Sequence, residues 1–174
     1  AIAKLQAAVA DIEGASVKAL KAQYPQGGEK VLIYECTGKI VPEGKLPSDV
    51  GCVVMNVSSI AFVAKYMRTG MPLITKRLTV DGDAIAEPKN VEVAIGTSFS
   101  DVIDFCGGFK TEPKKIIMGG PMMGFAVPTI NYPVLKNNNA ILAFSAAKAA
   151  EAEKPETPCI RCARCVNACP FSLM

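Results

Sequence analysis

Residues 159–170 read CIRCARCVNACP, which is the pattern C-x2-C-x2-C-x3-C-P. This spacing is typical of thiolates that ligate a [4Fe-4S] cluster, and in two-cluster ferredoxins the fourth cysteine ligates the other cluster. We therefore predict that Cys159, Cys162 and Cys165 bind one cluster and that Cys169 serves a second. Zinc sites usually pair two C-x2-C knuckles across a longer loop or include histidine, and neither arrangement occurs here. Zinc and unliganded thiols are the alternatives.

The composition is that of a globular protein. Of the 174 residues, 50% are hydrophobic, so the chain can bury a core, and its formal net charge is only +3. Lysine and arginine are scattered, which argues against a nucleic-acid partner, and we interpret the scattered charges as solvated faces. No apolar run approaches the roughly 18 residues of a membrane span. The absence of histidine excludes Ser-His-Asp and Cys-His nucleophiles.

Cysteine usage favours a reducing cytoplasm. Four of the seven cysteines fall within residues 159–169, whereas a disulfide framework would space them more evenly. Cys36, Cys52 and Cys106 have apolar neighbours in predicted elements, so we expect each to be a small buried side chain. A second cysteine motif is absent and Ala1 is not a natural start, so we expect the chain to be a piece of a longer protein.

Residues 1–70 alternate between helical and strand patterns. Periodicity, caps and turn residues predict helices over 2–12, 29–36 and 60–69, the last capped by Ser58 or Ser59, and strands over 17–24 and 50–57. The second strand is almost uniformly apolar, which is typical of a buried strand. Strands alternating with helices predict an α/β domain.

Residues 71–126 predict a small α+β module of the β-grasp kind. Alternating residues on both sides of Asp81-Gly82 predict a hairpin. Ser98 and Asp101 resemble a capping box that opens a short helix, which ends at Gly107-Gly108. A further strand is expected over 115–118.

The segment after this module carries weaker signals. We expect residues 127–145 to be irregular, with an exposed turn at residues 137–139, and residues 146–153 to form a helical connector. The two methionines of residues 119–124 are expected to pack between the β-grasp module and its neighbours, because methionine fills irregular gaps.

Six short segments occur in the order seen in one known family. They are YPQGGEK at 24–30, LPSDVG at 46–51, NVSS at 56–59, GMPL at 70–73, GGPMMG at 119–124 and CIRC at 159–162. With these motifs the sequence resembles, over nearly its whole length, the RnfC family, the NADH-facing subunit of the Rnf electron-transport complex.

The resemblance implies a fold for each part of the chain. Residues 1–70 correspond to the C-terminal half of a Rossmann-like α/β domain that binds FMN and NADH and is similar to the flavoprotein subunit of respiratory complex I. Residues 71–126 correspond to a soluble-ligand-binding β-grasp (SLBB) domain, residues 127–154 to a connector, and residues 155–174 to the first ferredoxin-like 4Fe-4S motif of an incomplete domain.

One candidate flavin or NADH contact is the segment Gly27-Gly28-Glu29-Lys30. Glycines let the backbone approach a phosphate, the following helix offers free N–H groups, and Lys30 adds positive charge. An ordinary strand-to-helix turn is the alternative. Gly28 and Glu29 match the family's Gly-Glu segment, in which the acidic residue lies beside the nicotinamide site.

A second candidate flavin contact is the pair Asn56 and Ser59, which lie where a predicted strand gives way to a helix. Such strand ends are where α/β sheets place ligands, although a helix cap is the alternative. In the family an Asn-Val-x-Thr segment contacts FMN, and Ser59 stands here in place of the threonine.

The resemblance implies electron transfer from NADH through FMN to [4Fe-4S] clusters and ferredoxin, in an ion-translocating complex with membrane subunits. The subunit itself would be peripheral, on the cytoplasmic face of the bacterial membrane. Two alternatives are a paralogue that serves a cobalamin or amino-acid reductase, and a non-catalytic docking or ligand-binding module.

Overall fold

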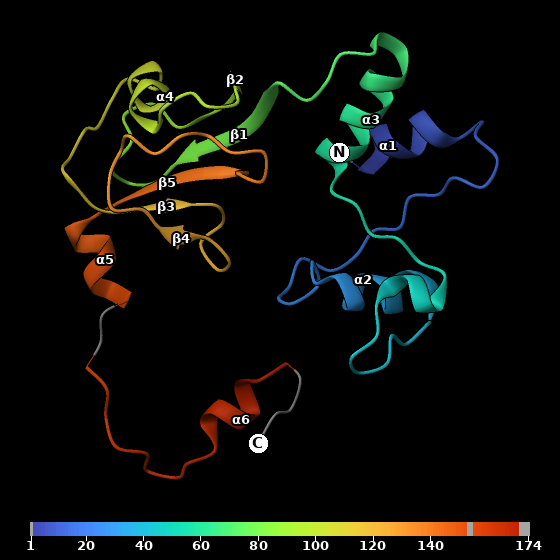
Figure 1. The fold of residues 1–174 in the computed structure, drawn as a ribbon. Coiled ribbons are helices and arrows are strands. Elements are labelled where there is room, and N and C mark those ends of the chain that lie inside the picture. Colours follow the sequence, from blue (N-terminus) through green and yellow to red (C-terminus); the bar gives the residue numbers. More distant parts are fainter. Residues whose placement is uncertain (1, 153–154, 171–174) are drawn as a thin grey trace. The chain divides into compact units, whose positions relative to one another are not determined.

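A computed structural model describes residues 2–152 and 155–170 of the chain (Figure 1). Contacts divide the chain into two compact units. One comprises the residues up to Asn56 together with those from Cys159 on, and the other runs from Val57 to Pro158.

The first unit is helical. Its elements are α1 (Ile2–Val9), α2 (Glu29–Thr37), the 3-10 helix η1 (Pro47–Val50) and α6 (Arg164–Ala168). Helix α2 ends at Gly38, which adopts φ 73° and donates its N–H to the carbonyl oxygen of Tyr34. Glycine takes this left-handed conformation without the steric cost that a Cβ would bring. The predicted helices over 2–12 and 29–36 are thus confirmed, with small shifts of their ends.

The two strands predicted in residues 1–70 are wrong. Within residues 2–74, all of which the structure describes, no strand forms, and Val53 in the supposed buried strand is 81% exposed. An apolar run becomes a strand only where a second strand satisfies its N–H and C=O groups. Residues 17–24 and 50–57 have no such neighbour here, so the α/β pattern expected for this part is not observed.

Helix α3 (Val57–Thr69) opens the second unit. It begins before the residues expected to cap it, so Asn56 precedes the helix whereas Ser58 and Ser59 lie in its first turn. Gly70 ends it as predicted, with φ 67° and an N–H that donates to the carbonyl oxygen of Tyr66. The apolar face predicted for this helix is exposed, since none of its residues is buried.

The rest of the second unit is built on a five-stranded sheet in the order β2-β1-β5-β3-β4 (Figure 1). The strands are β1 (Thr75–Asp81), β2 (Lys89–Ala94), β3 (Pro113–Met118), β4 (Phe125–Ala126) and β5 (Ala140–Ser145). Strand β1 pairs with β5 in parallel, and all other pairings are antiparallel. The β1–β2 hairpin and β3 confirm the strands predicted for residues 71–118.

Strand β5 was not predicted, and the expectation that residues 127–145 are irregular is wrong for its last six residues. It lies at the centre of the sheet, and its first four residues are buried. A strand buried on both faces lacks the apolar-polar alternation by which strands are recognised. The exposed turn expected at residues 137–139 is also wrong in part, because Asn138 is buried and its Oδ1 accepts the N–H of Ala140.

The hydrophobic core lies between this sheet and the helix α4 (Phe99–Phe105). Helix α4 contributes Phe99, Val102 and Ile103, all at most 1% exposed, and the sheet contributes Val80 and Ile141. The predicted cap is present, because the Ser98 side chain accepts the N–H of Asp101. Helix α5 (Ala146–Ala152) follows β5 and confirms the helix expected there.

The two expectations about cysteine and methionine side chains had mixed outcomes. Cys106 is fully buried in the core as predicted, whereas Cys36 is exposed and Cys52 only half-buried. Met122 and Met123 project into solvent, with 68% and 94% of their surface exposed. No helix among the described residues is long and apolar enough to cross a membrane.

Candidate functional sites

The first part of the cysteine motif, residues 159–163, forms a loop that precedes α6, and Cys165 lies within that helix. Arg161 and Ala163 adopt φ 56° and 58°, and the N–H of Arg161 donates to Sγ of Cys159 at 3.4 Å. Left-handed conformations cost a residue with a Cβ about 1–2 kcal/mol. Alternating right- and left-handed residues form concavities of inward N–H groups, which are found at many Fe–S sites. The thiolate donors and their spacing therefore fit an iron–sulfur cluster.

The four thiols are not gathered into a ligand set. Cys159, Cys162 and Cys165 are exposed, and Cys169, which follows α6 directly, is half-buried. Across residues 2–152 and 155–170 no three cysteine or carboxylate side chains are arranged to hold a metal ion. Because a thiolate set usually closes around its metal only on binding, the assignment of these cysteines stays a prediction.

The Gly27–Lys30 segment forms the turn that opens α2. Gly28 is extended, at φ −67° and ψ 136°, and its N–H donates to the carbonyl oxygen of Pro25 at 2.8 Å. A Cβ on Gly28 would lie 3.1 Å from that oxygen, so the close approach favours glycine. Glu29 occupies the first helical turn, and Lys30 donates from Nζ to the carbonyl oxygen of Pro42. The turn and helix exist as predicted, without the preceding strand.

The second candidate pair spans the boundary between the two units. Asn56 is the last residue of the first stretch of one unit, and Ser59 lies exposed in the first turn of α3 in the other. Gly28 and Ser59 thus belong to different units.

A cavity of about 570 Å³ lies between α3 and the start of the β1–β2 hairpin, inside the second unit. Its apolar lining includes Phe62, Val63, Met71, Leu73 and Ile74. Its charged lining consists of Lys65, Lys76, Arg77, Glu92 and Lys136. These charges come from four separate segments with no common motif, so sequence reasoning treated them as solvated and missed the site.

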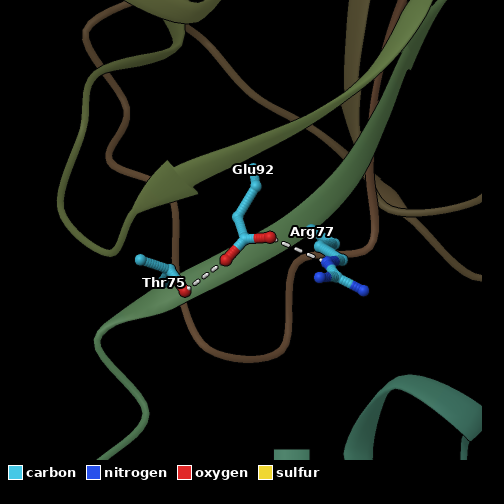
Figure 2. Close-up of polar contacts among 3 residues, drawn as sticks. All are labelled: Thr75, Arg77 and Glu92. Carbon is cyan, nitrogen blue, oxygen red and sulfur yellow. Dashed lines mark hydrogen bonds and ion pairs between the residues drawn. The ribbon is translucent and has the colours of Figure 1, made fainter. Parts of the chain in front are cut away.

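An ion pair between Arg77 and Glu92 lies on the polar side of this cavity (Figure 2). Arg77 donates its Nε–H to Oε2 of Glu92 at 2.8 Å, and the Thr75 hydroxyl donates to Oε1 at 2.9 Å. The hydrogen bond from Arg77, followed by that from Thr75, lowers the pKa of Glu92 below its ordinary value. Glu92 is therefore ionised at neutral pH, with both oxygens already occupied.

Two domain families match this chain. The Nuo51 FMN-binding domain family matches residues 1–65, and the SLBB domain family matches residues 77–126. These matches define the class of the chain as a segment of an FMN-binding domain followed by an SLBB domain.

Curated relatives identify the family. The chain is 51% identical over 135 residues to the C subunit of the proton-translocating ferredoxin:NAD(+) oxidoreductase complex of Clostridium ljungdahlii, an alignment that covers 76% of this chain and 30% of the relative. It is 47% identical over 145 residues to the C subunit of the Na(+)-translocating complex of Acetobacterium woodii, covering 83% and 33%. The C subunit of the ion-translocating oxidoreductase complex of Pseudomonas aeruginosa is 41% identical over 148 residues, covering 85% and 19%.

The chain therefore belongs to the family of C subunits of ion-translocating ferredoxin:NAD(+) oxidoreductase complexes, which confirms the RnfC resemblance. It spans between about a fifth and a third of the length of these three relatives.

Proposed function

We propose that the full-length protein containing this chain passes electrons between NADH and iron–sulfur clusters through FMN, as a subunit of an ion-translocating complex. One observation carries this proposal: a single chain joins an Nuo51-type FMN-binding segment to a C-x2-C-x2-C-x3-C-P motif. NADH gives up two electrons as hydride whereas a cluster accepts one, and bound FMN supplies the step between them.

The chain's own residues would divide the binding between two places. The backbone N–H groups after Gly27 and Gly28, together with Lys30, suit a phosphate at the start of α2. Glu29 in the first turn would face the nicotinamide, and Asn56 and Ser59 would supply polar contacts to FMN.

The cysteine loop would hold the electron acceptors. Cys159, Cys162 and Cys165 would ligate one [4Fe-4S] cluster, with the Arg161 N–H retained on Cys159 Sγ, and Cys169 would ligate a second cluster. A second motif beyond the present residues would complete both ligand sets. We propose domain limits of 1–70, 71–126, 127–154 and 155–174 for the flavin segment, SLBB domain, connector and ferredoxin-like segment, although β5 of the sheet lies beyond the second limit.

The names of the relatives support a proposal about the partners. Other subunits of the complex, membrane subunits among them, and ferredoxin or an equivalent carrier would exchange electrons with this subunit. We place the subunit at the cytoplasmic face of the membrane, as a peripheral component.

The test is anaerobic purification of the full-length protein with flavin and iron counts, followed by EPR before and after addition of NADH. The proposal expects bound FMN, about eight irons for two clusters, and cluster signals that appear on reduction by NADH. A protein that carries zinc, or that binds neither flavin nor iron, would contradict it and favour a docking module. Clusters reduced only by another donor would favour a paralogue that serves a different reductase.

A further inference from the structure

We propose that the cavity between α3 and the β1–β2 hairpin binds a small organic anion, in which a carboxylate or phosphate is attached to an apolar body. Its volume of about 570 Å³ lies within the range of roughly 300–1,000 Å³ that small-molecule sites occupy. This size favours a small molecule over a protein segment. Ser59, one of the proposed FMN contacts, also lines the cavity, whereas the charged residues that carry the present proposal are not among those contacts.

The charge of the lining selects an anion. Three lysines and Arg77 stand against one acid, Glu92, so four positive charges and one negative charge leave a net +3 at the cavity. Glu92 is also the group least able to hold a cationic ligand, because Arg77 and Thr75 already occupy its two oxygens. An oxyanion would therefore complement the four cationic side chains of the lining electrostatically.

Arg77 is the residue best placed to bind that oxyanion. Its Nε donates to Glu92 (Figure 2), whereas its terminal nitrogens make no hydrogen bond with another described residue. Within the described part of the chain, the only hydrogen bond and the only ion pair found for the Arg77 side chain are those to Glu92. A planar guanidinium fixed on one side can donate both terminal N–H groups to a carboxylate or phosphate.

The apolar side of the cavity accounts for the remainder of the ligand. Phe62 comes from α3, and Leu73 and Ile74 come from the segment that leads into β1. Ile74 is 54% exposed, so a bound apolar group would remove its surface from water. A ligand with a short alkyl or aryl body satisfies both the apolar and the cationic lining.

Calorimetric titration of the full-length protein that contains this chain tests the proposal with three probes of matched length: octanoate, octyl phosphate and octanol. The proposal expects the two anions to bind saturably at one site and octanol to bind at least tenfold more weakly. Equal binding of all three, non-saturable uptake, or no binding of either anion would overturn it. The last result would indicate that another part of the protein or a partner covers this cavity.

Substitutions in the lining test whether the anion binds in this cavity. Arg77→Gln should weaken octanoate binding about tenfold, since a charge-assisted hydrogen bond is lost, and Arg77→Lys should restore only part of it. Lys114→Gln is the matched control, because Lys114 is an exposed cation of β3 outside the cavity. Equal losses in Arg77→Gln and Lys114→Gln, or no loss in either, would overturn the assignment.

A protection experiment gives an independent readout that needs no variant. Octanoate should slow acetylation of Lys65, Lys76 and Lys136, measured by mass spectrometry, while leaving the rate at Lys114 unchanged. If octanoate slowed acetylation at none of the four lysines, or equally at all four, the result would contradict the site. Although Ser59 lines the cavity, none of the four lysines is a proposed flavin contact, so their protection by octanoate can be measured apart from flavin binding.

Discussion

Arg77 and Glu92 are direct partners in the register of β1 and β2, and Nε of the arginine lies 2.8 Å from Oε2 of the glutamate. Thr75, two residues earlier on the same face of β1, donates to the other carboxylate oxygen. Opposed pairs of this kind stabilise antiparallel strands by roughly 0.2–1 kcal/mol. Because β2 is an edge strand, this cluster ties the edge of the sheet to its neighbour.

The Arg77–Glu92 pair should make stability depend on pH in the acid range. The folded state lowers the pKa of Glu92, so its contribution is fully present above the unfolded pKa, near 4.5, and is lost as pH falls through the lower folded pKa. Glu92→Gln should therefore flatten the decline of unfolding free energy below about pH 4.5, with an effect of about 1 kcal/mol or less because the pair is exposed.

Urea denaturation between about pH 3 and pH 7, a range that brackets the ordinary glutamate pKa, measures this effect. Glu112→Gln is the control, since Glu112 is an exposed carboxylate outside the cluster. If both variants changed the pH profile equally, Glu92 would have no special role.

The cap of α4 is open to a direct test. The Ser98 side chain accepts the N–H of Asp101 at 3.1 Å and satisfies one of the unpaired donors at the start of the helix. Ser98→Ala should lower the unfolding free energy by about 1 kcal/mol. Ser100→Ala changes the same residue type in the first turn and should cost less. Thermal unfolding of the two variants decides the matter, and similar losses would argue against the cap.

Gly82 holds the turn after β1 against β5. It has φ 121°, and a Cβ there would lie 2.0 Å from the carbonyl oxygen of Ala143. Gly82→Ala should therefore combine backbone strain with a clash against backbone, and should cost on the order of 3 kcal/mol or more. Gly96→Ala is the matched control, since Gly96 has φ 97° and open space around it, so strain alone should cost about 1–2 kcal/mol. Equal losses of stability, measured by denaturant unfolding, would show that the close approach is not limiting.

Local chemistry predicted most of the second unit. The alternation in β1 and β2, the Ser98 cap and the glycines after α4 each act within a few residues, so each could be read without knowledge of the fold. Strand β5 could not be read in this way, because its burial on both faces depends on β1 and β3 lying beside it.

In the first unit, a local sequence pattern predicted a strand that does not form. The apolar run at residues 50–57 satisfies the local criteria for a buried strand, yet Val53 is exposed because no neighbouring strand is present. The cavity near Arg77 was missed for a related reason: its cations are brought together by folding and not by sequence spacing. The cysteine motif was recognised because cluster ligation requires short fixed spacings, which are visible in one dimension.

The prediction that Cys159 ligates an iron–sulfur cluster can be tested against a matched cysteine of the same chain. Cys159 and Cys36 are both exposed thiols, so they differ in their motif context and not in their access to solvent. After anaerobic reconstitution of the full-length protein with iron and sulfide, Cys159→Ser should lose about half of the iron, since one of two clusters loses a ligand. Cys36→Ser should retain all of it. Iron counts and the visible absorbance of the clusters measure both variants, and the two clusters should be distinguishable by EPR. Full iron content in both variants would show that Cys159 is not a ligand, and an equal loss in both would point to nonspecific binding by exposed thiols.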